Sequence, residues 1–257
     1  MRITVLAGPG RSTNILLNWL DEQGFDDVQA IIEKGISGRT KLRSRFKRLG
    51  LRTAFGQLVF QISVPPFLKM FSASRIGHIM NLHGLKDSTP LNSNIIHVDS
   101  VNDKKTINLL QERQPKIVIV NGTRIIRKNV LSSINCLFIN THAGITPQYR
   151  GVHGGYWALW NGDHRNFGVT VHLVDEGVDT GGVIAQVHAN PSAEDNFVTY
   201  PVLQQAISFA ILSEILADQN MHWLDHHKER DTKMETGRQW YHRTICQYFA
   251  GMMRGIK

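Results

Sequence analysis

The sequence predicts an α/β protein built on a doubly wound, mostly parallel sheet with helices on both faces. Short, continuous apolar runs alternate with longer segments of helical periodicity, and this alternation is typical of a parallel sheet that is covered on both sides. Several runs end at glycine or asparagine, as strands commonly do before a turn. With 42% hydrophobic and 19% charged residues, a chain of 257 residues can bury a large core.

Seven apolar runs are predicted to be strands, and the longer segments between them to be helices. The expected strands are 3–6, 28–32, 95–98, 116–120, 136–139, 169–174 and 183–188. The first helix is expected to use Ser12 or Thr13 as its N-cap, and further helices are expected at 106–114, 125–131 and 202–217. We expect residues 1–220 to form one domain with an insert at about 34–90, followed by a tail or small helical extension at 221–257.

The positive charge of the chain is concentrated in the insert. The formal net charge is +8, yet the segment from Lys34 to Lys86 holds eleven Lys or Arg and no Asp or Glu. The rest of the chain has 18 basic and 21 acidic residues, so no nucleic-acid partner is expected. A helix at 39–52, with Leu42, Phe46 and Leu49 on one face, either makes weak contact with an anionic membrane surface or packs on the core. We favour packing on the core.

Cysteine and histidine usage gives no disulfide framework and one metal-like pattern. Cys136 and Cys246 are far apart and neither belongs to a CxxC pair, which suits a reducing cytoplasm. The first residues are interpreted as a strand and not as a secretory segment, so a cytoplasmic location is expected. The metal-like pattern is the helically spaced set His222, Asp225, His226 and His227. A solvated helix end explains this set as well, and no metal is expected.

Three polar residues near predicted strand ends form a candidate site. Asn140 and His142 follow the strand at 136–139, and alternation along an extended chain places both on the same side. A carboxamide and an imidazole that converge can stabilise an oxyanion. The turn at 175–182 returns the carboxylate of Asp179 to the sheet edge, where it can orient a histidine or raise its pKa. Each residue alone is usually an ordinary turn residue, but their combination favours a catalytic site.

The turn after the first strand is a second candidate site. Gly8, Gly10, Ser12 and Asn14 lie where a helix N-terminus can hold a phosphate. An ordinary strand–helix turn is equally consistent with this pattern. Arg150, beside the Asn–His loop, can bind an acceptor's phosphate or pair with an acidic neighbour.

The segments NTHAGITPQYRG (140–151) and DEGVDTG (175–181) resemble the signature of the folate-dependent formyltransferases. The resemblance covers about residues 90–220, implies a Rossmann-like core, and makes residues 1–220 the catalytic domain. It places the family's catalytic residues on Asn140, His142 and Asp179, although Thr141 stands where Leu or Ile is common. It also implies that 10-formyltetrahydrofolate is the formyl donor. The residues expected to line the folate cleft are Asn121, Gly122, Ile125, Val174, Asp175 and Val178.

The resemblance implies transfer of a formyl group to a primary amine, without a metal and with His142 acting as an imidazolium beside Asp179. The expected acceptor is a nucleotide-linked amino sugar, because too few residues follow Ala217 for the β-barrel domain of the methionyl-tRNA enzymes. Its expected binding residues are Gly8, Gly10, Ser12, Asn14 and Arg150. Glycinamide ribonucleotide and hydroxyornithine-type acceptors stay open, as does a homodimer. A non-catalytic binding module is the alternative from another class, but the presence of all three catalytic residues argues against it.

Overall fold

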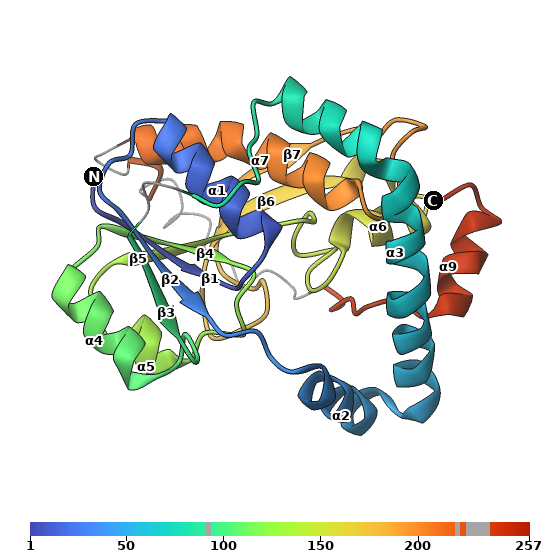
Figure 1. Ribbon diagram of the computed structural model, residues 1–257, viewed down its shortest axis with the longest axis horizontal. Helices are drawn as coiled ribbons and strands as arrows, with labels where there is room; N and C mark the ends of the chain where they lie inside the picture. Colours follow the sequence, from blue (N-terminus) through green and yellow to red (C-terminus); the bar gives the residue numbers. More distant parts are fainter. Residues whose placement is uncertain (91–93, 219–221, 225–236) are drawn as a thin grey trace.

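In the computed structural model, a single seven-stranded sheet forms the centre of the molecule (Figure 1). The structure describes residues 1–90, 94–218, 222–224 and 237–257. The strands are β1 (Ile3–Ala7), β2 (Val28–Glu33), β3 (Asn94–Val98), β4 (Ile117–Asn121), β5 (Leu137–His142), β6 (Gly168–Leu173) and β7 (Val183–His188). All seven predicted strands are confirmed. β5 runs three residues further than predicted, so Asn140 and His142 lie within the strand and not after it.

The sheet is parallel over most of its width and antiparallel at one edge. Its strand order is β3-β2-β1-β4-β5-β6-β7. The pairs from β3 to β5 are parallel, whereas β6 pairs antiparallel with both β5 and β7. The prediction of a mostly parallel sheet is confirmed. The antiparallel register places Asn140 directly opposite His172, which decides the geometry of the candidate site.

Helices cover both faces of the sheet, as predicted (Figure 1). The helices are α1 (Arg11–Glu22), α2 (Gly38–Leu49), α3 (Leu51–Leu82), α4 (Lys104–Arg113), α5 (Lys128–Leu131), α6 (Gly154–Trp160), α7 (Tyr200–Ala217) and α9 (Ile245–Met252), with short 3-10 helices at His164–Asn166 and His222–Leu224. α1, α7 and the end of α3 pack on one face, and α4 and α5 pack on the other. Within the described residues, α7 is apolar and long enough to cross a membrane, but 56% of it is buried inside the protein. We therefore interpret α7 as a core helix.

Three predicted helix boundaries are wrong. α1 has Gly10 as its N-cap, so neither Ser12 nor Thr13 caps it. The hydroxyl of Thr13 donates instead to the carbonyl of Gly8 at 2.6 Å. The helix expected at 125–131 begins only at Lys128. The helix expected at 39–52 ends at Leu49, because the next residue, a glycine, has a φ of 78° that turns the chain into α3.

The insert packs on the core through α3 and not through α2. Phe60, Val64 and Ile76 are buried on the inner face of α3. No residue of α2 is buried, and its predicted inner face, with Phe46 and Leu49, is only half-buried. The favoured interpretation of a packed excursion therefore describes α3 alone.

The described part of the tail packs against the same core. Trp240 forms a parallel bridge with Gly151, and the indole of Trp157 donates to the carbonyl of Tyr241 at 2.9 Å. The side chain of Arg243 is fully buried, and its guanidinium lies 4.1 Å from the ring centroid of Phe197. Cation–π contacts of this kind offset part of the cost of burying the charge. The described part of the tail is therefore built into the molecule and includes the helix α9.

Two partly buried histidines, His153 just before α6 and His242 in the tail, contact each other. The Nε2 of His153 lies 3.2 Å from the Nδ1 of His242. Burial lowers the pKa of His153 well below its usual value, and the neighbouring His242 and Arg243 add to this effect. Burial, together with the charges of Arg45 and Lys41, lowers the pKa of His242 to about 4. Both imidazoles are therefore neutral in the folded protein at neutral pH.

These two histidines should make the fold sensitive to mild acid. A histidine in the unfolded chain takes up a proton near pH 6.5, while these two resist it in the folded state. Their contribution to stability is thus complete above about pH 6.5 and is lost as the pH falls toward 4. The free energy of unfolding should fall by about 1.4 kcal/mol per pH unit for each proton of difference.

Urea unfolding at pH 7, 6 and 5 checks this prediction. We expect His153→Asn and His242→Gln each to show a shallower loss of stability, because neither replacement takes up a proton in the unfolded chain. Asn is chosen for position 153 because it tolerates the left-handed backbone (φ 59°) there. The control is His83→Asn, which changes an exposed histidine and should keep the original slope. Equal slopes in all four proteins would contradict the assignment.

Candidate active site

The pairing of β5 with β6 brings the predicted site residues together. Asn140 and His142 point to the sheet face that α4 and α5 cover, while Thr141 points to the opposite face. Asn140 pairs with His172 across the strands, and the Nδ2 of Asn140 lies 3.1 Å from the Nε2 of His172. A second imidazole is therefore part of the site.

The carboxylate of Asp179 reaches this cluster from the turn between β6 and β7. One of its oxygens, Oδ2, lies 3.4 Å from the Nδ1 of His142. The other, Oδ1, lies 3.5 Å from both the Nε2 of His172 and the Nδ2 of Asn140. The backbone amide of Gly151 donates to Oδ2 at 2.8 Å. Asp179 holds a φ of 50°, an uncommon conformation that aspartate tolerates better than most residues.

His142 faces an acceptor at each ring nitrogen. Its Nε2 lies 2.8 Å from the carbonyl of Tyr149, so this nitrogen carries a proton, and its Nδ1 faces Asp179. The side chain is 7% exposed. Burial lowers the pKa of His142, although the carboxylate of Asp179 and the Tyr149 carbonyl act in the opposite direction. The lowered pKa favours the neutral imidazole in the free protein at neutral pH; the imidazolium expected to act during the reaction stays a prediction.

Asp179 remains charged in this surrounding. Burial alone would raise the pKa of its carboxyl group, but the hydrogen bond with His172, the proximity of His142 and the amide of Gly151 together lower it below the ordinary value. The cluster thus contains one buried negative charge beside two imidazoles. This arrangement can accept or relay a proton without a large change in structure.

The loop after β5 closes over His142 because it contains a glycine at a tight contact. A Cβ on Gly144 would lie 2.5 Å from the carbonyl of Tyr149 and 2.8 Å from the Nε2 of His142. Any side chain there would separate the imidazole from its carbonyl acceptor.

The predicted acceptor-binding residues do not form one group. Gly8, Gly10 and Ser12 stay together at the start of α1. The amide of Asn14 instead donates to the carbonyl of Asp87 at 3.2 Å, away from this turn. Arg150 lies near the Asn–His–Asp cluster, where its Nε donates to the carbonyl of Gly237 at 2.7 Å. Of the two roles left open for Arg150, pairing with an acidic neighbour is not the one seen, because its guanidinium donates to the backbone carbonyls of Gly237 and Val178.

The predicted folate-lining residues are also divided. Val174, Asp175 and Val178 lie in the turn that carries Asp179, and a surface ion pair of 3.3 Å from Lys128 to Glu176 places this turn beside α5. Ile126 of the segment after β4 and Val174 of the turn also belong to one apolar cluster. Gly122 and Ile125 belong to that segment, where Ile125 is 59% exposed. Asn121 differs from the expectation, because its Nδ2 donates to the hydroxyl of Thr13 at 3.1 Å and its side chain faces α1.

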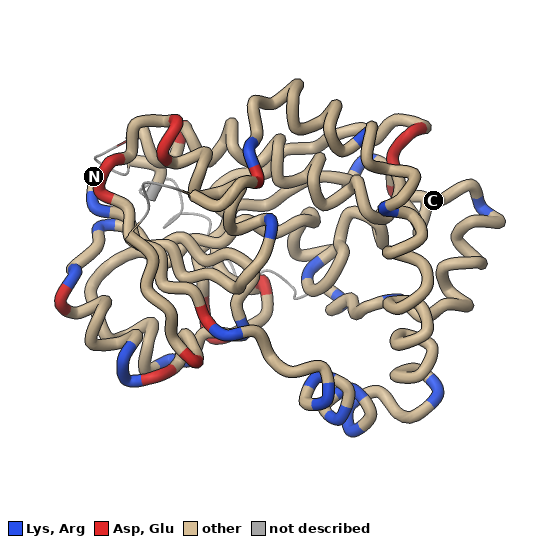
Figure 2. Tube along the Cα trace, viewed as in Figure 1, with Lys and Arg blue, Asp and Glu red and all other residues tan. Residues whose placement is uncertain are grey.

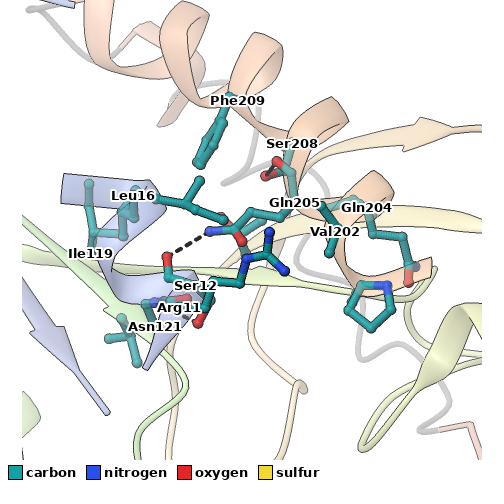
Figure 3. A pocket seen from close by; sticks show the side chains of 16 residues that line it. Arg11, Ser12, Leu16, Ile119, Asn121, Val202, Gln204, Gln205, Ser208 and Phe209 are labelled. Carbon is teal, nitrogen blue, oxygen red and sulfur yellow. Dashed lines mark hydrogen bonds between the residues drawn. The ribbon is translucent and has the colours of Figure 1, made fainter. Parts of the chain in front are cut away.

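A cavity of about 310 Å³ lies between α1, α7 and the sheet (Figure 3). Thr141, Ile119 and Val169 form its floor, and Arg11, Ser12, Asn121, Gln204, Gln205 and Ser208 supply polar groups around it. Because Thr141 points into it, the cavity lies on the sheet face opposite Asn140 and His142. The cavity therefore adjoins the cluster only around the ends of β4 and β5.

His172 is the site residue that the sequence analysis missed. It stands in an apolar strand and looks like a buried core histidine, and only its distance of seven residues from Asp179 connects it with the site. Among the described residues, no group of three or more His, Cys, Asp or Glu could hold a metal ion. Asp225, His226 and His227 of the metal-like pattern lie outside the described residues. His222 contacts Asp218, with its Nδ1 2.9 Å from the carboxylate.

The doubly wound sheet and the polar cluster at its strand ends define a class of α/β proteins with a ligand site at the sheet edge. The chain belongs to the formyl transferase family, whose model matches residues 72–205, more than half of the chain.

Similar proteins agree with this family. The methionyl-tRNA formyltransferase of Finegoldia magna is 36% identical over 101 residues, which are 39% of this chain and 32% of that protein. The match thus spans only about a third of the length of that relative. Two solved structures share the fold. A sugar N-formyltransferase from a Shewanella species has a TM-score of 0.54 and 14% identity, over 93% of this chain and 76% of that one. The phosphoribosylglycinamide formyltransferase of Streptococcus pneumoniae has a TM-score of 0.53 and 20% identity, over 84% and 98%.

The electrostatic coupling between Asp179 and His142 can be measured directly. Asp179→Asn removes the negative charge that raises the pKa of His142, so His142 should titrate at a lower pH in this variant. NMR titration of the His142 ring signals gives the value. Asp175→Asn is the matched control, because Asp175 lies in the same turn but is exposed and binds Gly177 and Thr180. An unchanged His142 titration in Asp179→Asn would show that the two groups are not coupled.

Proposed function

We propose that this protein transfers a formyl group from 10-formyltetrahydrofolate to a primary amine of a small-molecule acceptor. The observation that carries the proposal is the Asn–His–Asp cluster (Asn140, His142 and Asp179), which lies largely shielded from solvent at the strand ends of a formyl transferase family member. A carboxamide, an imidazole and a charged carboxylate are the groups that formyl transfer to an amine requires.

Asn140 stabilises the charge that develops on the formyl oxygen. One N–H of its amide is directed toward His172 and Asp179, and the second can donate to the formyl oxygen. A fixed donor in a buried site costs no reorganisation during the reaction. The contacts of Asn140 with His172 and Asp179 hold the amide in place.

His142 and Asp179 manage the proton that the attacking amine loses. 10-Formyltetrahydrofolate supplies the formyl group, and its N10 takes up a proton as the bond to the formyl carbon breaks. His142 is neutral before the reaction because of its burial, so it can accept a proton, and Asp179 then stabilises the imidazolium. For His142 to donate to the formyl oxygen, it must release its contact with Asp179, which at 3.4 Å is longer than the contact with Tyr149.

The donor's most suitable position is the side of the sheet that Asn140 faces. The turn with Val174 and Val178 and the segment with Gly122 and Ile125 border this side. Ile125 offers an exposed apolar side chain there, which can pack against the flat ring of a folate.

We further propose a nucleotide-linked amino sugar as the acceptor. Two cavities border the first turn, which supports an elongated acceptor. The cavity of about 310 Å³ contacts Arg11 and Ser12, and one of about 490 Å³ contacts Pro9, Lys34 and Lys105. The two lysines can bind the phosphates of a nucleotide. Of the three carboxylates that also line this cavity, Glu33, Asp99 and Asp103, Glu33 is already paired with Arg124. The fold is also that of the Shewanella sugar N-formyltransferase.

The direct test is a screen of amine acceptors with 10-formyltetrahydrofolate that follows the release of tetrahydrofolate. With any active acceptor, Asn140→Ala and His142→Ala should each reduce kcat by about a hundredfold or more. The matched control is Asn108→Ala, which changes an exposed asparagine on α4, and it should keep normal turnover.

Two results would contradict the proposal. Near-normal turnover in Asn140→Ala or His142→Ala would remove these residues from the mechanism. Binding of 10-formyltetrahydrofolate without turnover on any amine would favour the non-catalytic binding module. Activity on simple amines but on no nucleotide-linked amino sugar would contradict only the choice of acceptor.

A further inference from the structure

The outer face of α3 exposes large apolar side chains along its whole length. Leu51, Phe55 and Ile62 lie before the two prolines at 65 and 66, and Phe67, Met70 and Phe71 lie after them. Each of the six is at least 60% exposed. The rings of Phe67 and Phe71 contact each other, with centroids 5.0 Å apart, and not the core. α9 packs beside α3 and adds Phe249, Met252 and Met253 to the exposed apolar residues.

An apolar surface of this extent is uncommon on a soluble monomer and indicates an interaction site. The inner face of α3 already satisfies the core through Phe60 and Val64. The outer residues are therefore not needed for packing, and we call them, together with the exposed residues of α9, the outer patch.

The outer patch adjoins the most basic part of the chain. Residues 34–86 contain eleven Lys or Arg and no acidic residue, and Figure 2 shows basic residues but no acidic ones along α2 and α3. Arg75 and Lys86 form ion pairs with carboxylates elsewhere in the molecule. Within the described part of the chain, the other nine form no ion pair. α2 also has no buried residue. Arg45 donates to Gln61 and Arg48 lies over the ring of Tyr241, while Arg39, Lys41, Arg43 and Lys47 are exposed and available to a partner.

We propose that α2, α3 and α9 form a docking surface for an anionic phospholipid membrane. A bilayer with anionic headgroups attracts the unpaired cations of α2, and its interface accepts the apolar side chains of α3 and α9. The same surface fits other partners less well. A nucleic acid would leave aliphatic groups such as Ile62 and Met70 without apolar contact. In a dimer formed through this surface, residues 34–86 of the two chains would face each other. These basic segments would repel each other, because neither contains an acidic residue.

This proposal is independent of formyl transfer and reverses the preference for a purely packed insert. The reason is that a packed excursion would bury the apolar residues of both helices, whereas those of α2 are only half-buried and the outer ones of α3 are at least 60% exposed. α7, by contrast, has its apolar residues inside the core and takes no part in the docking.

Co-sedimentation with vesicles tests the charged component. The full chain should bind vesicles of phosphatidylglycerol and phosphatidylcholine at 150 mM salt, and should bind pure phosphatidylcholine much less. Arg39→Gln, Arg43→Gln and Lys47→Gln in one protein should weaken binding to anionic vesicles by roughly a hundredfold. The matched control replaces three exposed basic residues outside the insert, with Lys104→Gln, Arg127→Gln and Arg165→Gln, and should bind almost as well as the original chain.

A second variant tests the apolar component. Phe67→Ser, Met70→Ser and Phe71→Ser together should weaken vesicle binding by roughly tenfold or more. Because these side chains are exposed, the melting temperature should stay unchanged, which separates loss of docking from loss of the fold.

Three outcomes would overturn the proposal. The first is absence of binding to anionic vesicles, and the second is equal weakening by the control triple. The third is a dimer in analytical ultracentrifugation that the Phe67, Met70 and Phe71 variant converts to a monomer without any change in vesicle binding.

Discussion

The candidate site depends on one buried carboxylate that must remain paired. Asp179 is 14% exposed, and an unpaired charge at that depth would cost several kcal/mol. Its partners come from three separate segments, namely β5, β6 and the loop at 143–153. Pairing the charge therefore fixes the relative positions of His142, His172 and the amide of Gly151. The left-handed backbone of Asp179 is the local cost of this arrangement.

The antiparallel return of β6 makes this pairing available. β6 runs back along β5, so His172 lies opposite Asn140, and the short turn that follows brings Asp179 to both. The opposite face of the same strand carries Thr141 into the cavity beneath α1 and α7. Alternation along β5 thus places the Asn–His–Asp cluster and the cavity on opposite faces of the sheet. The two adjoin only around the end of the sheet.

Sequence reasoning could predict what depends on local patterns. The seven strands and the shared side of Asn140 and His142 follow from apolar runs and alternation. It could not predict features that depend on pairing between distant segments. His172 joins the site through strand register, and Asn121 turns toward Thr13 because two strand ends adjoin. The lowered pKa of His142 in the free protein also could not be predicted, because the sequence pattern shows the nearby carboxylate but not the burial that outweighs it.

The insert shows the same limit. Paired prolines usually end a helix, yet α3 continues through Pro65 and Pro66 for 32 residues in all. As a result, the apolar residues of the insert lie on two faces of one helix. The inner face holds α3 on the core, and the outer face is free for the proposed membrane contact. The composition of the insert includes both sets of residues, but it does not show which face of the helix each set lies on.

The most direct test of the central claim is a crystal structure of this chain with bound tetrahydrofolate. The account predicts that the folate lies on the sheet face of Asn140 and His142, with its N10 near the Asn140 amide and its ring between the turn at 174–179 and the segment after β4. Tetrahydrofolate bound only in the cavity between α1 and α7, with the Asn–His–Asp cluster out of reach of N10, would contradict it.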